Sequence, residues 1–182
     1  MKRLIVFQHL EREGPGLFSQ IAKGYGLDVE IYRLDIGDDF PTLMKEDILL
    51  VLGGSMGVKD IDKDKHPWLK KKFNFIKTAL ENKSSIIGVC LGAQLLAYAA
   101  GGDIEKLSSG IPLKLKKEIG WSEISSNFSN IKKDNDFEKL YTFLKEPLEV
   151  LHWHEDRIIL PCSAKLIASS QNCNEQLFQI GK

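Results

Sequence analysis

The sequence is poor in cysteine and histidine and has no excess of charge of either sign. Only three of its 182 residues are cysteine and four are histidine, and 25 basic residues balance 25 acidic ones. Three irregularly spaced cysteines indicate neither a disulfide framework nor a zinc site, although one of them can still be catalytic. A neutral balance leaves no electrostatic signature of a protein that binds nucleic acid or an anionic membrane.

Long apolar runs are also absent. No run reaches the roughly 20 residues that span a bilayer, and Leu4–Phe7 is too short for the core of a signal peptide. We therefore expect a cytoplasmic protein whose partners are neither membranes nor nucleic acids. The short basic runs Lys70–Lys72 and Lys114–Lys117 are predicted to be solvated surface. With 43% apolar residues, the chain is long enough to bury a hydrophobic core.

The first hundred residues alternate short apolar runs with amphipathic segments. This pattern predicts an α/β fold with a doubly wound, mostly parallel sheet. On the first helix, Leu17, Phe18, Ile21 and Ala22 form one apolar face. Strands are expected at residues 3–8, 29–33, 47–52 and 85–90, and helices at 16–25, 67–82 and 92–100.

After Gly102 the pattern changes to short strands joined by hairpin-like connections. These are expected at residues 113–115, 120–124, 149–152 and 165–169, with a loop at 125–136 and a helix at 137–144. Neither a repeat nor a linker divides the chain, so we expect one domain over residues 1–182, with an antiparallel elaboration in its second half. Residues 176–180 read as one more strand. A doubly wound domain normally continues with a strand and a covering helix, which we therefore expect to be missing.

The segment Gly88-Val89-Cys90-Leu91-Gly92 lies between a predicted strand and a predicted helix. It is a nucleophile elbow with cysteine in place of serine. The two glycines permit a tight turn, which lifts the Cys90 side chain above the carboxyl ends of the strands. The helix N-terminus favours the thiolate, and the Leu91 N–H can help to hold an oxyanion. The alternative is an inert, buried cysteine beside a glycine-rich turn.

Two further motifs are weaker when taken alone. Gly53-Gly54 follows a predicted strand and is either an ordinary turn or a place where the backbone approaches a ligand. His152 and His154 are two residues apart on a predicted strand, so their side chains share a face and could bind a metal. No third ligand is evident in the sequence, so we expect no metal. Either histidine could serve as the base that a cysteine nucleophile needs.

Together these segments resemble the class I glutamine amidotransferases, and most of all the free-standing proteins similar to the glutaminase domain of GMP synthase. The resemblance extends over nearly the whole chain. The segments that carry it are Gly53–Val58, His66–Leu69, Gly88–Leu96, Glu118–Trp121, His152–His154, Leu160-Pro161, Ser169-Ser170 and Gln176–Gly181. It implies a flavodoxin-like fold and no cofactor.

The resemblance also implies a mechanism. Cys90 would attack the side-chain amide of glutamine, ammonia would leave, and water would release glutamate from the thioester. The N–H groups of Gly54 and Leu91 would form the oxyanion hole. Gln94 and the backbone around His154 would contact glutamine. Because no synthetase domain is fused, a partner synthetase or a small molecule would accept the ammonia.

Two departures from the family pattern leave alternatives open. No residue matches the family's later His-x-Glu motif, which supplies the catalytic base, and Glu155 stands where the family has glycine. The chain could therefore be an impaired glutaminase, or a non-catalytic binding or regulatory module that keeps the fold. A third hypothesis makes His154 the base, with Asp156 orienting it.

Overall fold

The computed structural model describes residues 2–127 and 138–181. Within the chain, residues 1–100 and residues 101–182 form two compact units, and each is described by itself. The single domain that the sequence suggests over residues 1–182 stays a prediction, as does the missing strand and helix.

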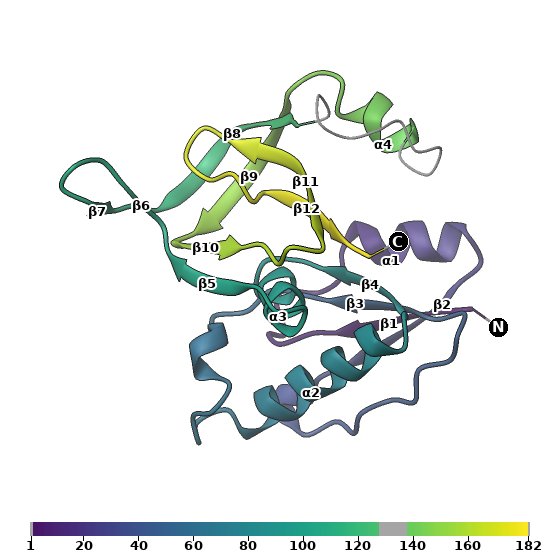
Figure 1. The fold of residues 1–182 in the computed structure, drawn as a ribbon. Helices are drawn as coiled ribbons and strands as arrows, with labels where there is room; N and C mark the ends of the chain where they lie inside the picture. The colour runs from purple at the N-terminus through teal and green to yellow at the C-terminus, as the bar shows by residue number, and fades with distance from the viewer. Residues whose placement is uncertain (1, 128–137, 182) are drawn as a thin grey trace. The chain divides into compact units, whose positions relative to one another are not determined.

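The first unit is built on a four-stranded parallel sheet (Figure 1). Its strands lie in the order β2-β1-β3-β4, so the chain runs outward in both directions from β1, as a doubly wound fold requires. Ile5 on β1 and Leu49 on β3 are completely buried, because both faces of the central strands are covered. The strands are β1 (Arg3–Phe7), β2 (Asp28–Tyr32), β3 (Ile48–Val51) and β4 (Ser85–Gly88).

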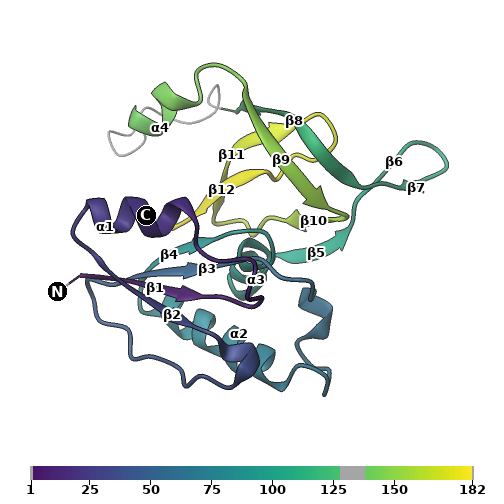
Figure 2. The same cartoon turned by 180° about the vertical axis from the view of Figure 1, so that it is seen from behind.

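Helices α1 and α2 lie on opposite faces of this sheet (Figures 1 and 2). On the α1 side, Leu4, Val6 and Leu50 pack with Ala22. On the other side, Phe7 meets Phe75 of α2, with ring centroids 5.2 Å apart. The predicted α/β fold with a parallel sheet is confirmed. The helices are α1 (Leu17–Gly24), α2 (Pro67–Glu81) and α3 (Leu91–Ala99), with short 3-10 helices η1 (Leu34–Ile36) and η2 (Val58–Asp60).

The apolar face predicted for α1 is only partly buried. Ala22 is buried, but Leu17 and Ile21 are exposed. Ile21 lines a groove of about 500 Å³ between α1 and the sheet, together with Phe18, Ile87 and other residues. Ile87 belongs to β4, the last strand in the order of this sheet.

The second unit is largely antiparallel, as expected. Its main sheet has the order β12-β11-β8-β9, while β5 pairs with β10 and β6 with β7. The sequence analysis missed β5 and β10, because each has only four residues, of which at least half are polar, and the two strands pair with each other. Of the predicted loop at 125–136, Ser125 and Ser126 belong to β8, and residues 128–136 lie outside the described residues.

The elements of the second unit are β5 (Asp103–Lys106), β6 (Ser108–Ser109), β7 (Lys114–Leu115), β8 (Glu118–Ser126), α4 (Glu138–Phe143), β9 (Leu148–His154), β10 (Asp156–Ile159), β11 (Ala164–Ser170) and β12 (Leu177–Ile180). Across both described ranges, no helix combines the length and the apolar character needed to cross a membrane.

Helix α3 packs directly on the sheet through Gly92. A Cβ atom at this position would lie 2.0 Å from the carbonyl oxygen of Val51 on β3. Neither residue can move easily to relieve this clash, because the Gly92 backbone is part of α3 and the Val51 carbonyl is part of β3. The first turn of α3 therefore requires glycine.

We predict that Gly92→Ala lowers the free energy of unfolding by about 3 kcal/mol, the upper end of ordinary overpacking. The matched control is Gly24→Ala at the end of α1, where an added Cβ meets nothing within 4 Å. This control is expected to be neutral or to stabilise by up to about 1 kcal/mol. Urea unfolding followed by circular dichroism measures both variants. Equal stabilities would contradict the close approach of α3 to β3.

Candidate functional site

Cys90 occupies a strained turn between β4 and α3. Its backbone has φ 53° and ψ −114°, in a region that residues with a side chain rarely adopt. The turn is held by two backbone hydrogen bonds, from the Val89 N–H to the Val51 carbonyl (2.9 Å) and from the Gln94 N–H to the Cys90 carbonyl (3.0 Å). The Cys90 side chain is exposed. These are the features of a nucleophile elbow rather than of an inert, buried cysteine.

The loop after β3 lies against this turn. A Cβ atom on Gly53 would be 3.3 Å from the Cys90 Cβ and 3.7 Å from its Sγ. A Cβ atom on Gly54 would be 3.4 Å from the Leu91 side chain. The structure therefore brings together three of the predicted site residues, namely Cys90, Gly54 and Leu91.

The other two predicted residues belong to different parts of the chain. Gln94 is buried in the first turn of α3, one turn beyond Cys90. His154 ends β9 in the second unit, and its surroundings are described below with that unit. Their contact with glutamine stays a prediction.

A buried histidine and lysine, which the sequence analysis did not single out, support the Gly53-Gly54 loop. The His9 Nδ1 lies 2.6 Å from the Gly53 carbonyl oxygen, and its Nε2 lies 2.7 Å from the Lys72 Nζ. The His9 ring also stacks on Trp68, with ring centroids 5.6 Å apart. Because a carbonyl only accepts, Nδ1 carries the proton and Nε2 accepts from Lys72. The prediction that Lys70–Lys72 is solvated is thus wrong for Lys72, which is completely buried.

His9 fixes the orientation of one peptide group. The Gly53–Gly54 bond is trans, so its carbonyl oxygen and its N–H point in opposite directions. When His9 holds the Gly53 carbonyl, the Gly54 N–H is directed away from His9. This is the N–H that the resemblance assigns to the oxyanion hole.

Burial determines the charges of the pair. It lowers the pKa of His9 to about 4, with a further contribution from Lys72, so His9 is neutral at physiological pH. It also lowers the pKa of Lys72 to about 7. The Lys72 Nζ lies 5.2 Å from the centre of the Trp68 ring, which provides a cation–π contact when the amine is charged.

In the second unit, the His154 side chain is oriented by backbone and by Glu118. Its Nδ1 donates to the Asp156 carbonyl oxygen (3.0 Å), and its Nε2 lies 2.9 Å from the Glu118 Oε2. Asp156 therefore contacts His154 through its main-chain carbonyl and not, as the hypothesis implied, through its carboxylate. The carboxylate pairs with Lys106 instead (3.0 Å). Glu118 was missed because only the β8–β9 register places it opposite His154.

Glu155 is engaged in surface ion pairs. Its carboxylate lies 2.7 Å from the Lys106 Nζ and 2.9 Å from the Lys117 Nζ. These two lysines lower its pKa to about 2, so the group is ionised at physiological pH. The side chain that replaces the family's glycine thus directs its charge to solvent-exposed lysines. The expectation that Lys114–Lys117 is exposed surface is confirmed.

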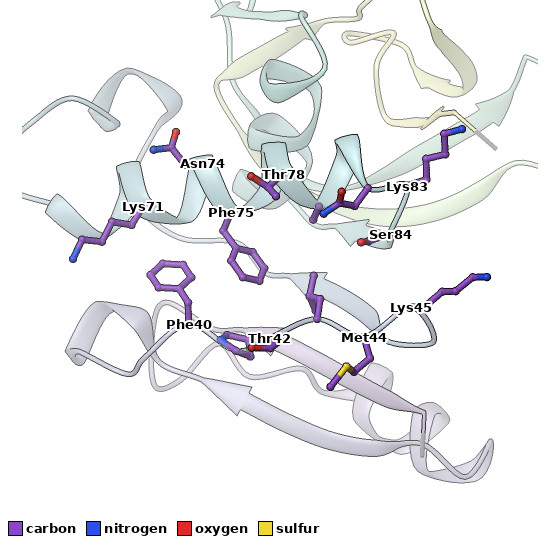
Figure 3. Close-up of a pocket in the computed structure, with 14 residues that line it drawn as sticks. Phe40, Thr42, Met44, Lys45, Lys71, Asn74, Phe75, Thr78, Lys83 and Ser84 are labelled. Carbon is purple, nitrogen blue, oxygen red and sulfur yellow. The ribbon is translucent and has the colours of Figure 1, made fainter.

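A separate pocket of about 810 Å³ lies between α2 and residues 40–45 (Figure 3). Phe40 and Phe75 form an aromatic pair in its wall, with ring centroids 5.5 Å apart. Lysines 45, 71 and 83 are also among its lining residues. None of the predicted site residues lines this pocket, so it has no part in the proposed chemistry.

Comparison with known proteins identifies the group to which this arrangement belongs. Residues 18–180 match the family described as glutamine amidotransferase class-I. A solved glutamine amidotransferase of Thermotoga maritima superposes with a TM-score of 0.81 at 26% identity, over 98% of this chain and 71% of that one.

Three curated relatives show the range of the family. A glutamine amidotransferase-like protein of Salmonella typhimurium is 27% identical over 95% of this chain and 68% of its own length. Gamma-glutamyl peptidase 3 of Arabidopsis thaliana is 29% identical over 63% of this chain and 43% of its own. A glutamine-hydrolyzing GMP synthase subunit of Methanococcus aeolicus is 31% identical over 59% of this chain and 50% of its own length. The chain thus spans about half to two thirds of the length of these relatives.

The buried Lys72 predicts a particular dependence of stability on pH. Between pH 7 and 10.5 the unfolded protein binds a proton at Lys72 that the folded protein lacks, so stability rises with pH. Lys72→Met removes this contribution. The stability of the wild type relative to the variant should therefore rise by about 1.4 kcal/mol per pH unit above pH 7.

Urea unfolding at pH 7, 8 and 9 measures this slope. Lys77→Met, at an exposed lysine on the same helix, is the control and should follow the wild type at every pH. A Lys72→Met variant that also follows the wild type would show that Lys72 is solvated in solution.

Proposed function

Since the chain belongs to the class I glutamine amidotransferase family, we propose that it cleaves a γ-glutamyl amide through a thioester on Cys90, with glutamine as the substrate. The observation that carries the proposal is the strained backbone of Cys90 at the junction of β4 and α3, beside the Gly53-Gly54 loop. Strain of this kind is retained where a nucleophile must be held out from the sheet.

In the first step the Cys90 thiolate attacks the amide carbon. The carbonyl oxygen becomes an oxyanion, which the N–H groups of Gly54 and Leu91 would stabilise. The C–N bond then breaks, and the nitrogen takes up from water the proton that the Cys90 thiol lost on ionising, so that it leaves as ammonia. In the second step water attacks the thioester, which releases glutamate and restores the thiol.

His9 is poorly suited to be the base in these steps. Both of its ring nitrogens are engaged, one by the Gly53 carbonyl and the other by Lys72. Its pKa of about 4 also lies well below the range in which a base works best at neutral pH. We assign His9 a positioning role, in which it holds the Gly53-Gly54 peptide through the Gly53 carbonyl.

A second substrate class shares the same acyl group. Two of the relatives are gamma-glutamyl peptidases, and in a γ-glutamyl peptide the leaving group is an amine in place of ammonia. The thioester chemistry is otherwise unchanged. If glutamine is the substrate, we propose that the ammonia passes to a separate synthetase or small-molecule acceptor, because two GMP synthases are among the relatives.

The direct test is release of ammonia and glutamate from glutamine, measured beside release of glutamate from glutathione. The wild type should form the two products of glutamine in equal amounts. Cys90→Ala should lower the rate by at least about 1000-fold, as loss of a nucleophile does in comparable enzymes. Cys162→Ala, which removes another exposed cysteine, should leave the rate unchanged.

The outcomes separate the alternatives. Turnover of glutathione alone would identify a γ-glutamyl peptidase and exclude glutamine as the substrate. A folded wild type that turns over neither compound would favour a non-catalytic binding module. Activity that survives Cys90→Ala would remove Cys90 from the mechanism.

The elbow also predicts a difference in thiol reactivity. With iodoacetamide at pH 7, Cys90 should be alkylated faster than Cys162, because Cys90 is exposed at the N-terminus of a helix. Cys173 should be slowest, because it is buried and its burial raises the pKa of its thiol to about 11. Peptide mass spectrometry over a time course gives the three rates. Equal rates in the folded protein would rule out activation by the elbow.

A further inference from the structure

Three potential metal ligands converge in the second unit, on neighbouring strands of its main sheet. In the β8–β9 register, Glu118 stands opposite His154 and Gly120 opposite His152. Residues two apart on a strand share a face, so both histidines lie on the same side as Glu118. One ligand atom from each of the three residues lies within 4.8 Å of the other two. Glu118 and His152 are buried, and His154 is partly buried.

The outer nitrogen of each histidine is already engaged by a backbone carbonyl. His154 Nδ1 lies 3.0 Å from the Asp156 oxygen, and His152 Nε2 lies 3.3 Å from the Ser122 oxygen. Because carbonyls only accept, these two nitrogens carry the protons of the neutral rings. The lone pairs of His154 Nε2 and His152 Nδ1 therefore face inward. Metal-binding histidines are typically held in this way.

Both lone pairs face the same carboxylate oxygen. The Glu118 Oε2 lies 2.9 Å from His154 Nε2 and 3.6 Å from His152 Nδ1. Lone pairs at such distances need a donor or a positive centre beside them. Among the contacts of the described residues, the only donor at these lone pairs is the Gln176 amide described below, which does not face His152. One additional proton could satisfy one of the two contacts, but protonating both rings would leave two cations against one buried carboxylate. A divalent cation satisfies all three groups at once.

We propose that Glu118, His152 and His154 bind a zinc ion. Two imidazoles and one carboxylate are typical zinc ligands. In a tetrahedral site with bonds of 2.0–2.1 Å, neighbouring ligand atoms lie about 3.3 Å apart. The distances from Glu118 Oε2 to His154 Nε2 and His152 Nδ1, 2.9 and 3.6 Å, bracket this value, and all three ligand atoms lie within 4.8 Å of one another. The expectation of no metal rested on the lack of a third ligand, which Glu118 supplies.

Neighbouring side chains complete the site. Ser170 Oγ donates to Glu118 Oε1 (2.6 Å), and this leaves Oε2 directed at the histidines. Gln176 Nε2 lies 2.7 Å from Oε2 and 3.2 Å from His154 Nε2. The Gln176 carboxamide would turn to present its oxygen when the ion binds. The ion would tie β9 to β8, a structural role that does not depend on the chemistry of Cys90.

The test is a titration of the purified, metal-stripped chain with Zn²⁺ in competition with a chromophoric chelator. We expect one Zn²⁺ per chain, a rise in Tm on binding, and at least ten-fold weaker binding by Glu118→Gln and by His154→Gln. His66→Gln, at a histidine of the first unit, is the matched control and should bind as the wild type does. Prior alkylation of the thiols should not change the affinity.

A spectroscopic measurement on the wild type keeps the test informative even if a variant fails to fold. In ¹⁵N spectra of the histidine rings, Zn²⁺ should shift the Nε2 of His154 and the Nδ1 of His152 and leave His9 unchanged. The proposal is overturned if Zn²⁺ leaves both signals unmoved, or if alkylation abolishes binding. Protonation of both nitrogens of His154 at neutral pH, with no zinc bound, would identify the positive centre as a proton.

Discussion

The close contact between α3 and β3 is the constraint on which the candidate site depends. A Cβ atom on Gly92 would lie 2.0 Å from the Val51 carbonyl oxygen, so α3 packs tightly against β3, and only two residues connect β4 to this helix. These two residues are Val89 and Cys90, and the chain turns between them and the helix with a positive φ at Cys90. Val51 also ends the strand that leads into Gly53-Gly54. A single packing contact therefore aligns the thiol and the neighbouring peptide group.

The buried His9 and Lys72 hold the Gly53-Gly54 loop in place, and burying the lysine lowers the stability of the protein. Lys72 loses its solvation, and its pKa falls by several units as a result. An apolar residue at this position would avoid that cost but could not donate to His9. Without a donor at Nε2, the buried lone pair of this nitrogen would be unsatisfied, which costs about 1–3 kcal/mol. The lysine therefore supports the loop indirectly, by satisfying the second nitrogen of the histidine that holds the Gly53 carbonyl.

The sequence was informative wherever a feature is local. The strand–elbow–helix segment around Cys90 could be predicted because glycine spacing and apolar runs encode it directly. The burial of Lys72 was missed because a lysine in a basic run was taken to be exposed, although its position in α2 indicates burial. It lies three residues after Leu69 and four before Ile76, within the buried stripe of α2. Glu118 could not be found at all, because it becomes a neighbour of His154 only through strand pairing.

The buried histidines of the two units show that environment, rather than residue type, decides what a histidine does. His9 has an acceptor on one ring nitrogen and a donor on the other, so the neutral ring is fully satisfied and can only position its neighbours. His152 and His154 each have a backbone acceptor on one nitrogen and the same carboxylate oxygen near the other. Two neutral rings and a carboxylate leave this cluster rich in lone pairs. Gln176 supplies one neutral donor beside Glu118 and His154, and a bound cation would satisfy the remaining lone pairs, whereas His9 in the first unit has no lone pair left to satisfy.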